Sequence, residues 1–474
     1  MKSILFLDDW MIEYRDSLER VWGKAKFVKE LFVNYYPNFL GYGGYITVFF
    51  DESIGKYVLY LAVFPPAADP EVFVVRLESD DLLNWPHPEY RESVVPAWKG
   101  FRNVVTDQNG HRFWPFSIIP LQGTSIEQFG YVTGEWYMPP AETAEIRARN
   151  GISALGFSQD GINFIVDREK PWRKPGSDVP GHIMWNESKS LFHIATRICN
   201  LDRRISIATS PDLKKFTDPF VVLQPDALDK VGTEFYEMPV RPYEDVFIGL
   251  LHVQTTDRFE LNRYKRTGRM DTQLAYSYNG FSWYRPNRNP LIGLRDYGLL
   301  GGGQVYGQEM FRTPDNRLLF YSSSTMGEHA FYPDMQEAGE DTTGVIGTLL
   351  HELRLDGFCS LKTYAREGIL RTKTLIPKGN ELTINVITTN HTHVRVRILD
   401  GESAIPINGY DWDDAIPIRG DHLFAPVRWK EHPDISGLIN KPVRIEIKIH
   451  EAEIFAIRLN YDAYFATLPL ESLA

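Results

Sequence analysis

The sequence predicts an all-β protein, a five-bladed β-propeller followed by a C-terminal β-sandwich. Four segments share the pattern Ser-x-Asp/Asn-Gly/Leu-x-x-aromatic, and each follows a stretch of β-forming residues. A strand, a tight polar turn and an aromatic residue that recur along a chain are typical of a radial repeat array. Beyond about residue 365, apolar and polar residues alternate, which is typical of sheets with one buried face. The four segments are residues 79–85, 158–164, 210–216 and 277–283.

The repeats are unevenly spaced along the chain, which fits propeller blades with loop insertions better than a solenoid with a strict period. A weaker fifth copy at residues 353–358 keeps the strand, Asp-Gly and aromatic order but lacks the serine. Five such units of about four strands each predict a propeller over residues 1–365 and a sandwich over residues 366–474. We expect the repeated turns to be structural, because Ser and Asp side chains tie such turns to their own backbone.

Two strands are expected before the turn of each repeat. In the first repeat they are residues 45–50 and 57–64, joined by a turn that contains Gly55. The second repeat begins near residues 112–119, where the pattern is weakest. The remaining expected elements are hairpins at residues 182–195, 238–251 and 308–321, sandwich strands at 382–387, 393–399 and 443–449, and helical fragments near 8–18 and 141–149.

The composition is that of an ordinary globular protein, with 43% hydrophobic and 24% charged residues among 474. A net charge of −11 argues against a nucleic-acid partner, whose phosphates need a basic face. The two cysteines form no disulfide framework, and reduced thiols fit a cytoplasmic location. The N-terminal apolar stretch is too short for a signal-peptide core, and no apolar run approaches a membrane span. A homo-oligomer is possible.

Acidic residues stand just before the first strands of three repeats. Propeller blades bring their innermost strands together at one axis, so these residues are expected to share a funnel. Two carboxylates are the usual means of splitting a glycosidic bond: one protonates the leaving oxygen, and the other attacks the anomeric carbon or activates water. The acids are Asp178 in the third repeat, Glu237 in the fourth with Glu234 close by, and Glu309 in the fifth.

Each of these acids also has a structural interpretation. Asp178 follows Gly-Ser, and Asp is a common turn residue. Glu237 has apolar and aromatic neighbours, which can raise a carboxyl pKa toward that of a general acid, but it is equally placed for an exposed edge strand. Glu234 is its rival for this role, and Glu309 is either a substrate-binding acid or a solvent-facing one.

The first repeat has no acid of its own at this position. Asp8 and Asp9 fill the gap if the N-terminal strand reaches the funnel, and their structural alternative is to cap the segment that follows them. His182 and His329 are candidates for binding substrate hydroxyls, although a lone histidine is more often structural. Motifs for metal ligation, phosphate loops, dinucleotides and serine nucleophiles are missing, so no metal and no cofactor are expected.

Several segments resemble the glycoside hydrolase family 32 and 43 superfamily of five-bladed fructosidase-like and arabinanase-like enzymes. The chain is more similar still to an uncharacterised bacterial group described as family-32-like. The resemblance implies a glycosidase, with Glu237 as general acid because Glu237-Met238-Pro239 is similar to the Glu-Cys-Pro segment of family 32. The family's Asn-Asp-Pro-Asn and Arg-Asp-Pro segments have no counterpart here. The matching segments are residues 5–13, 203–210, 236–240, 248–251, 273–277, 415–421 and 427–429.

The sequence therefore predicts a glycoside hydrolase that cleaves a small oligosaccharide or glycoside, for example a fructoside-like or arabinoside-like one. Asp178 and one of Asp8 or Asp9 would serve as base, nucleophile or stabiliser beside Glu237, and the sugar subsite would be lined by Tyr42, Trp114 and Tyr306. One alternative is a phosphorylase on the same fold. The other alternative is a non-catalytic carbohydrate-binding propeller. The candidate phosphate ligands of the phosphorylase are Arg241, Arg258 and His329.

Overall fold

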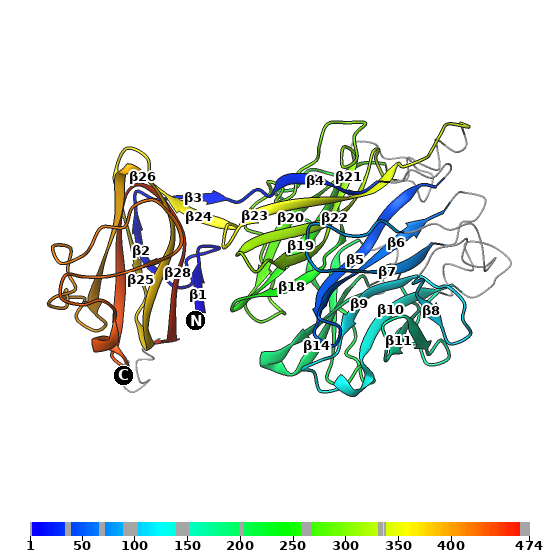
Figure 1. The fold of residues 1–474 in the computed structure, drawn as a ribbon, viewed down its shortest axis with the longest axis horizontal. Helices are drawn as coiled ribbons and strands as arrows, with labels where there is room; N and C mark the ends of the chain where they lie inside the picture. Colours follow the sequence, from blue (N-terminus) through cyan, green and yellow to red (C-terminus); the bar gives the residue numbers. More distant parts are fainter. Residues whose placement is uncertain are drawn as a thin grey trace. The chain divides into compact units, whose positions relative to one another are not determined.

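The structure is nearly all β, as the sequence predicts (Figure 1). It is a computed structural model of the chain. Its described elements are strands, apart from short 3-10 turns at Glu127–Phe129, Glu187–Lys189 and Ser436–Leu438. None of its described helices is long and apolar enough to cross a membrane. The residues described are 2–33, 39–65, 72–88, 103–138, 151–177, 179, 181–198, 203–256, 267–329, 335 and 338–464.

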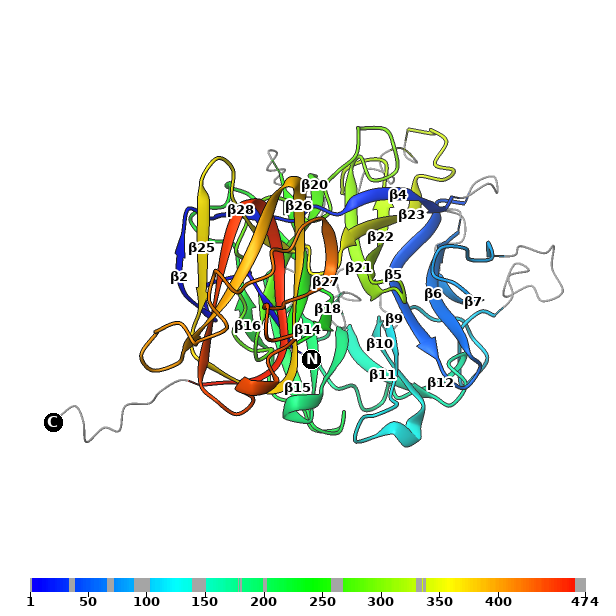
Figure 2. The same ribbon diagram turned by 60° about the vertical axis from the view of Figure 1, so that its left-hand side comes forward.

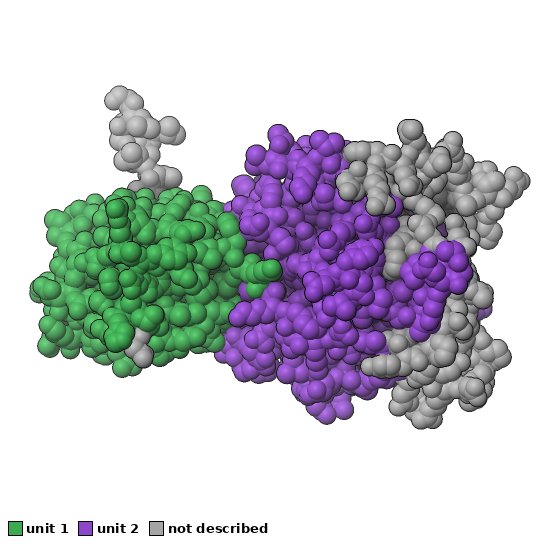
Figure 3. Space-filling view, turned by 90° about the horizontal axis from the view of Figure 1, so that it is seen from above, with its two compact units in different colours: residues 1–24, 354–474 green, residues 25–353 purple. Residues whose placement is uncertain are grey.

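The chain divides into two compact units (Figure 3). Unit 1 comprises Met1–Lys24 and Arg354–Ala474, and unit 2 comprises Ala25–Leu353. This division differs from the predicted boundary at residue 365 in two ways. The chain leaves unit 2 at residue 353, and the N-terminal segment belongs with the C-terminal part of the chain.

The described strands of unit 2 form antiparallel groups that follow one another in the sequence (Figures 1 and 2). The predicted hairpins of the repeats are present in them. The groups are β5 (Gly41–Asp51), β6 (Lys56–Phe64) and β7 (Phe73–Ser79); β8 (Thr106–Asp107), β9 (Pro115–Pro120), β10 (Tyr131–Tyr137), β11 (Ile152–Ser158) and β12 (Asn163–Val166), with β8 parallel to β12; β13 (His182–Asn186), β14 (Leu191–Thr196), β15 (Ile205–Ser210) and β16 (Phe220–Leu223); β17 (Thr233–Glu237), β18 (Val240–Tyr243), β19 (Val246–Thr255) and β20 (Arg269–Ser277); and β21 (Gln304–Arg312), β22 (Arg317–Thr325) and β23 (Ile346–Arg354) with β4 (Lys26–Phe32).

Single parallel pairs connect three of these groups into one larger sheet. Met270 of β20 pairs with Gln304 of β21, and Ile346 of β23 pairs with Gly41 of β5. Strand β6 shows how neighbouring groups pack, because it is an almost continuous apolar run that is buried on both faces. One face contacts the β8–β12 group through Val58, Tyr60 and Ala62, and the other contacts β22 and β23 through Leu59, Leu61 and Val63.

Unit 1 combines N-terminal and C-terminal strands in one eight-stranded sheet. The predicted helical fragment near residues 8–18 is wrong, because Ile12–Asp16 forms strand β2 and pairs with β25. The second predicted helical fragment, at residues 141–149, lies outside the described residues. The strands of unit 1 are β1 (Lys2–Leu5), β2, β3 (Glu19–Trp22), β24 (Cys359–Lys362), β25 (Glu367–Thr372), β26 (Leu375–Asp400), β27 (Asp421–Pro426) and β28 (Val443–Ala463).

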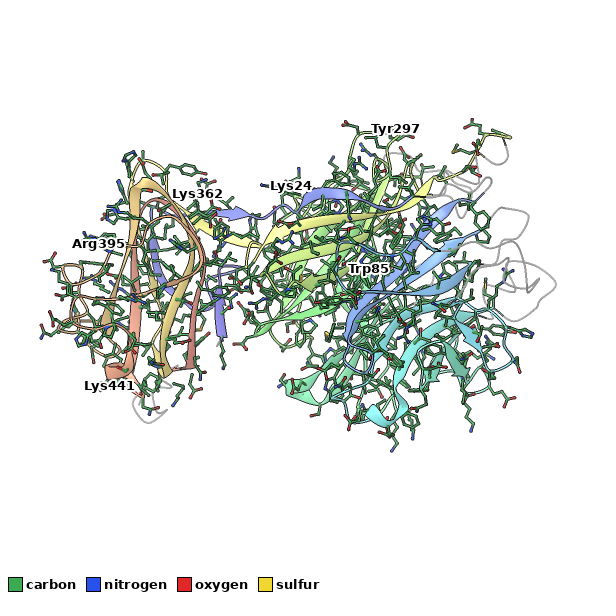
Figure 4. The ribbon with its side chains drawn as sticks, in the orientation of Figure 1. Lys24, Trp85, Tyr297, Lys362, Arg395 and Lys441 are labelled. Atoms are coloured by element: carbon green, nitrogen blue, oxygen red, sulfur yellow. The ribbon has the colours of Figure 1, made fainter. Side chains whose placement is uncertain are left out.

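The structural role predicted for the repeated turns is confirmed. In the second repeat, Asp160 Oδ1 accepts hydrogen bonds from the backbone N–H groups of Ile162 and Asn163, both at 2.8 Å. The same carboxylate or amide contacts recur in the other three repeats. Trp85, the aromatic of the first repeat, lies among the strands of unit 2 (Figure 4). The weak fifth copy differs, because Asp356 forms a buried ion pair with Arg458 in unit 1.

Candidate active site

A cavity of about 260 Å³ lies within unit 2 and is lined by residues far apart in the sequence. Most of them belong to strands β5, β17, β21 and β22, so it forms where several antiparallel groups meet. Aromatic rings make up much of the wall, and Glu237 is the one carboxylate among the described lining residues. The lining consists of Gly44, Tyr45, Phe64, Trp114, Tyr236, Glu237, Gln304, Tyr306, Gln308, Ser323, Thr325, His329 and Ile346.

Glu237 is the last residue of β17 and is only 3% exposed. A bulge between Phe235 and Glu237 interrupts the pairing of β17 with β19 and places Glu237 opposite His252. His182 Nε2 donates a hydrogen bond to Glu237 Oε1. On the other side of the carboxylate, His252 Nδ1 lies 3.6 Å from Oε2. The carboxylate is therefore held between two buried imidazoles.

These imidazoles reverse the pKa shift expected for a carboxyl among apolar neighbours. Burial by itself raises the pKa of Glu237, but the electrostatic and hydrogen-bonding interactions with His182, and then those with His252, outweigh it. The pKa of Glu237 is held well below its usual range as a result. The expectation of a raised pKa is wrong, because it considered the apolar neighbours in sequence and not the imidazoles that the fold brings together.

The aromatic wall on one side of the cavity depends on an irregular strand. The pairing of β5 with β6 is interrupted between Gly43 and Thr47, and Tyr45 adopts a positive φ of 37°. Tyr45 thereby packs against Phe116, with ring centroids 3.8 Å apart, and near Trp114 at 5.7 Å. A residue of the cavity lining is thus placed by a backbone conformation that residues other than glycine rarely adopt.

The opposite wall is built around Tyr236. The guanidinium carbons of Arg197 and Arg203 lie 4.7 Å and 5.1 Å from the centre of its ring. The rings of His329 and Tyr306 follow at 5.4 Å and 5.9 Å. The two arginines fix the orientation of Tyr236, and the packed rings offer apolar faces to a ligand.

Two buried polar atoms of the lining have no hydrogen-bond partner in the described structure. They are Gln308 Oε1, an acceptor, and Trp114 Nε1, a donor. Buried polar groups are normally satisfied, so both atoms are suited to bind hydroxyl groups of a ligand. Other polar residues of the wall are already engaged: the Tyr306 hydroxyl bonds to Gln304, whose amide in turn donates to Thr325 Oγ1 at 2.8 Å.

Several predicted residues meet at this cavity. Glu237, Trp114, Tyr306 and His329 line it, and His182 contacts Glu237 directly. Tyr42 does not line it: the residue is fully buried in a hydrophobic cluster beside His87, because the bulge turns Tyr45 toward the cavity in its place.

Two predicted acids are engaged elsewhere. Glu234 forms an ion pair with Arg203 at 3.1 Å. Glu309 is bound by Arg241 through both carboxylate oxygens and also accepts the Val48 backbone N–H at 3.2 Å. Neither residue belongs to the cavity lining. Arg241, a candidate phosphate ligand, is occupied by the same ion pair.

Three further predicted acids have no described place in the cavity lining. Asp8 and Asp9 belong to unit 1, where Asp8 accepts the Trp10 backbone N–H at 2.7 Å and Asp9 pairs with Arg20 at 2.6 Å. Asp178, like Arg258, lies outside the described residues. In the described part of the chain, no group of three or more His, Cys, Asp or Glu side chains is arranged to hold a metal ion.

His252 is a site residue that the sequence analysis missed. Its signal was present in the fourth repeat, because the β18–β19 hairpin continues into the pairing of β19 with β17. Counting forward along β19 from Gly249 in the register of the hairpin leads to His252 opposite Glu237, because the bulge lies beyond this pair, between Phe235 and Glu237. The prediction placed the hairpin at residues 238–251 and did not continue its register to the next residue.

No protein-family model and no curated protein sequence matches the chain. Solved structures that are similar to it include a glycoside hydrolase with 14% identity and a TM-score of 0.44, over 69% of this chain and 92% of the other. A family 32 β-fructofuranosidase from Bombyx mori has 13% identity and a TM-score of 0.42, over 92% and 95%. A family 43 arabinoxylan arabinofuranohydrolase from Bacillus subtilis has 9% identity and a TM-score of 0.38, over 89% and 96%. The last two structures carry the names of families 32 and 43.

Proposed function

We propose that the chain is a glycoside hydrolase that binds an uncharged sugar in the cavity and exchanges protons with it through Glu237. The observation that carries the proposal is the buried Glu237 carboxylate, which lines an aromatic-walled cavity and is held between two imidazoles. A carboxylate in contact with an imidazole can take a proton from it and return one to it, as acid–base pairs do in catalysis. Rings and unsatisfied polar atoms around it suit the faces and hydroxyls of a sugar.

The proposal also covers how the strand groups are arranged into domains. We take the antiparallel groups of unit 2 as the five blades of a propeller and unit 1 as the sandwich that accompanies it. The packing of β6 between two neighbouring groups supports this, because each blade of a radial array must contact the one before and the one after.

In the reaction, Glu237 delivers a proton to the oxygen of the leaving group as the glycosidic bond breaks. Aromatic walls exclude bulk water from this carboxyl and hold the sugar ring against it. We propose that Asp178 supplies the second carboxylate of the reaction, on the strength of its position before the first strand of the third repeat.

Hydrolysis is favoured over phosphorolysis by the charges around the cavity. The described lining contains no arginine and no lysine, whereas a phosphate ion is normally bound by such cations. Of the three candidate phosphate ligands, Arg241 is bound to Glu309 and His329 lines the cavity. Arg258 lies outside the described residues.

The test is to incubate the protein with a panel of nitrophenyl glycosides and short oligosaccharides and to measure released nitrophenol and reducing ends. We expect cleavage of at least one substrate without added phosphate, and a loss of about 10²–10⁴-fold in Glu237→Gln. Glu169→Gln, which changes an exposed glutamate, is the matched control and should keep full activity. Sugar binding without cleavage would identify a binding protein, and cleavage only with phosphate would identify a phosphorylase; either outcome contradicts the proposal.

A further inference from the structure

We propose that His252 is a positioning residue that stores the proton exchanged by Glu237, as a buried imidazolium behind the carboxylate. The inference deepens the proposed function and rests on it. His252 is 0% exposed and does not belong to the cavity lining, so it touches no substrate. Its influence on the reaction therefore passes through Glu237.

Both ring nitrogens of His252 face oxygen acceptors. Nε2 lies 2.8 Å from the carbonyl oxygen of Gly307, which has no hydrogen to give, so Nε2 must be the donor. Nδ1 lies 3.6 Å from Glu237 Oε2, which is longer than a hydrogen bond but within ion-pair range. A neutral imidazole with its hydrogen on Nε2 would direct the Nδ1 lone pair at a carboxylate oxygen. A proton on Nδ1 turns this repulsion into attraction and makes the ring a cation.

His182 does not need a second proton. Its Nε2 donates to Glu237 Oε1, while its Nδ1 has no hydrogen-bond partner in the described structure. One hydrogen, on Nε2, satisfies this geometry in the neutral ring. The two histidines differ in the ring nitrogen that points away from Glu237. In His252 this nitrogen, Nε2, donates to a carbonyl, whereas in His182 it is Nδ1 and needs no hydrogen. The extra proton is therefore assigned to His252.

The neighbours of His252 leave Glu237 as its proton partner. Glu237 faces it from β17, with His182 beyond the carboxylate, and Tyr306 packs against it from β21 with ring centroids 5.3 Å apart at 84°. On β20 the residue opposite is Thr272, which does not titrate. The electron-rich ring of Tyr306 beside it favours a positive imidazole.

The proton balance is as follows. His252 Nδ1 passes its proton to Glu237 Oε2 and becomes neutral, keeping the hydrogen on Nε2. Glu237 passes a proton to the leaving oxygen as its bond to the anomeric carbon breaks. The water that attacks the sugar loses one proton, which Glu237 accepts and returns to Nδ1. One water is consumed, and His252 and Glu237 end in the state in which they began.

The charged state of His252 can be tested without any substrate, by ¹⁵N NMR of the imidazole nitrogens of the full chain at pH 7. We expect one of the 12 histidines to carry hydrogens on both nitrogens, and this signal to vanish in His252→Gln. Glu237→Gln should also remove the signal, because it deletes the negative charge that holds the proton. Burial lowers the pKa of His193 and His351 to about 4, so these two rings serve as neutral references in the same spectrum.

A neutral His252 with hydrogen on one nitrogen only would overturn the proposal, since the proton would then reside on Glu237. The second measurement is the pH dependence of kcat/KM on a cleaved glycoside. In His252→Gln we expect activity to fall about 10- to 100-fold at pH 7 and its alkaline limb to move to lower pH by about one to two units. An unmoved limb with merely reduced activity would indicate a structural role. A charged His252 in a protein that cleaves no glycoside would refute the proposed function while leaving the charge assignment intact.

Discussion

Glu237 and Glu309 lie at comparable points of two strands but have opposite surroundings. Both are 3% exposed, and each follows a bulge, in β17 and in β21. Glu237 meets two imidazoles, and an imidazole can exchange a proton with a carboxylate. Glu309 meets the guanidinium of Arg241, which cannot. Burial and a negative charge are therefore not sufficient for proton exchange, because the partner decides whether the proton can move.

The difference extends to the polar atoms around each carboxylate. Glu309 is further bound by the backbone N–H groups of Val48 at 3.2 Å and Met310 at 3.0 Å. Its neighbour Gln308, in contrast, lines the cavity with an unsatisfied Oε1. Two adjacent residues of β21 thus differ: the carboxylate of Glu309 is fully hydrogen-bonded within the protein, whereas Gln308 presents a free acceptor to the cavity.

Removing the partner of Glu309 should have the largest effect on stability. Arg241→Met leaves a buried carboxylate without its cation, and we expect the free energy of unfolding to fall by about 3–5 kcal/mol. Urea unfolding measures this. The double variant Arg241→Met/Glu309→Met should recover most of the loss, because it removes both charges. Unchanged stability combined with lost turnover would contradict the distinction between the two carboxylates.

Asp271 gives a third environment, in which a half-buried carboxylate has an amide as its closest partner. Burial raises its pKa to about 6, although Gln273 donates to it at 3.0 Å and the charge of Arg285 opposes the shift. Because the folded state favours the neutral form, its contribution to stability is complete below about pH 4 and is lost as pH rises through about 6. Asp271→Asn should therefore gain up to about 3 kcal/mol at pH 7 and nothing at pH 3.5. Urea unfolding at the two pH values tests this, and an equal effect at both would be inconsistent with it.

Asp160 represents the opposite case, an exposed carboxylate whose partners are backbone N–H groups. Burial raises its pKa, but the hydrogen bonds of Asn163, Ile162 and Ser158 together outweigh this and lower it to about 2. Asp160→Ala should cost about 1–2 kcal/mol at pH 7, where solvent screens part of the effect. Because the folded pKa is lowered, this difference from wild type should fade as pH drops through about 2. Asp160→Asn keeps the acceptor and should lose less; thermal unfolding of the two variants compares them.

The smallest effect is expected at the cavity wall. Trp114→Phe keeps an aromatic ring and removes the unsatisfied Nε1 donor. If that donor binds a sugar hydroxyl, KM should rise about three- to tenfold with little change in kcat. Steady-state kinetics on the best glycoside of the panel measures this. Trp85→Phe, in a repeat turn outside the lining, is the control and should leave KM unchanged.

Much of the fold was predictable because its signals are local. Turn chemistry at Asp160 and its equivalents, and the apolar run of β6, each depend on residues within one short segment. The chain order of strands and turns also directed attention to Glu237. The same reasoning failed for Tyr42, because a bulge in β5 turns Tyr45 to the cavity instead. It also failed for the helix predicted near residues 8–18, because β25, from the C-terminal part of the chain, pairs with this segment and makes it a strand.

The sequence by itself determined the all-β architecture, the structural nature of the repeated turns and the candidacy of Glu237. Only the tertiary structure decided which groups surround each buried carboxylate. His182 is 55 residues from Glu237, and Arg241 is 68 residues from Glu309. The charge state of a buried carboxylate is set by the groups within a few ångströms of it, and the fold alone brings such groups together.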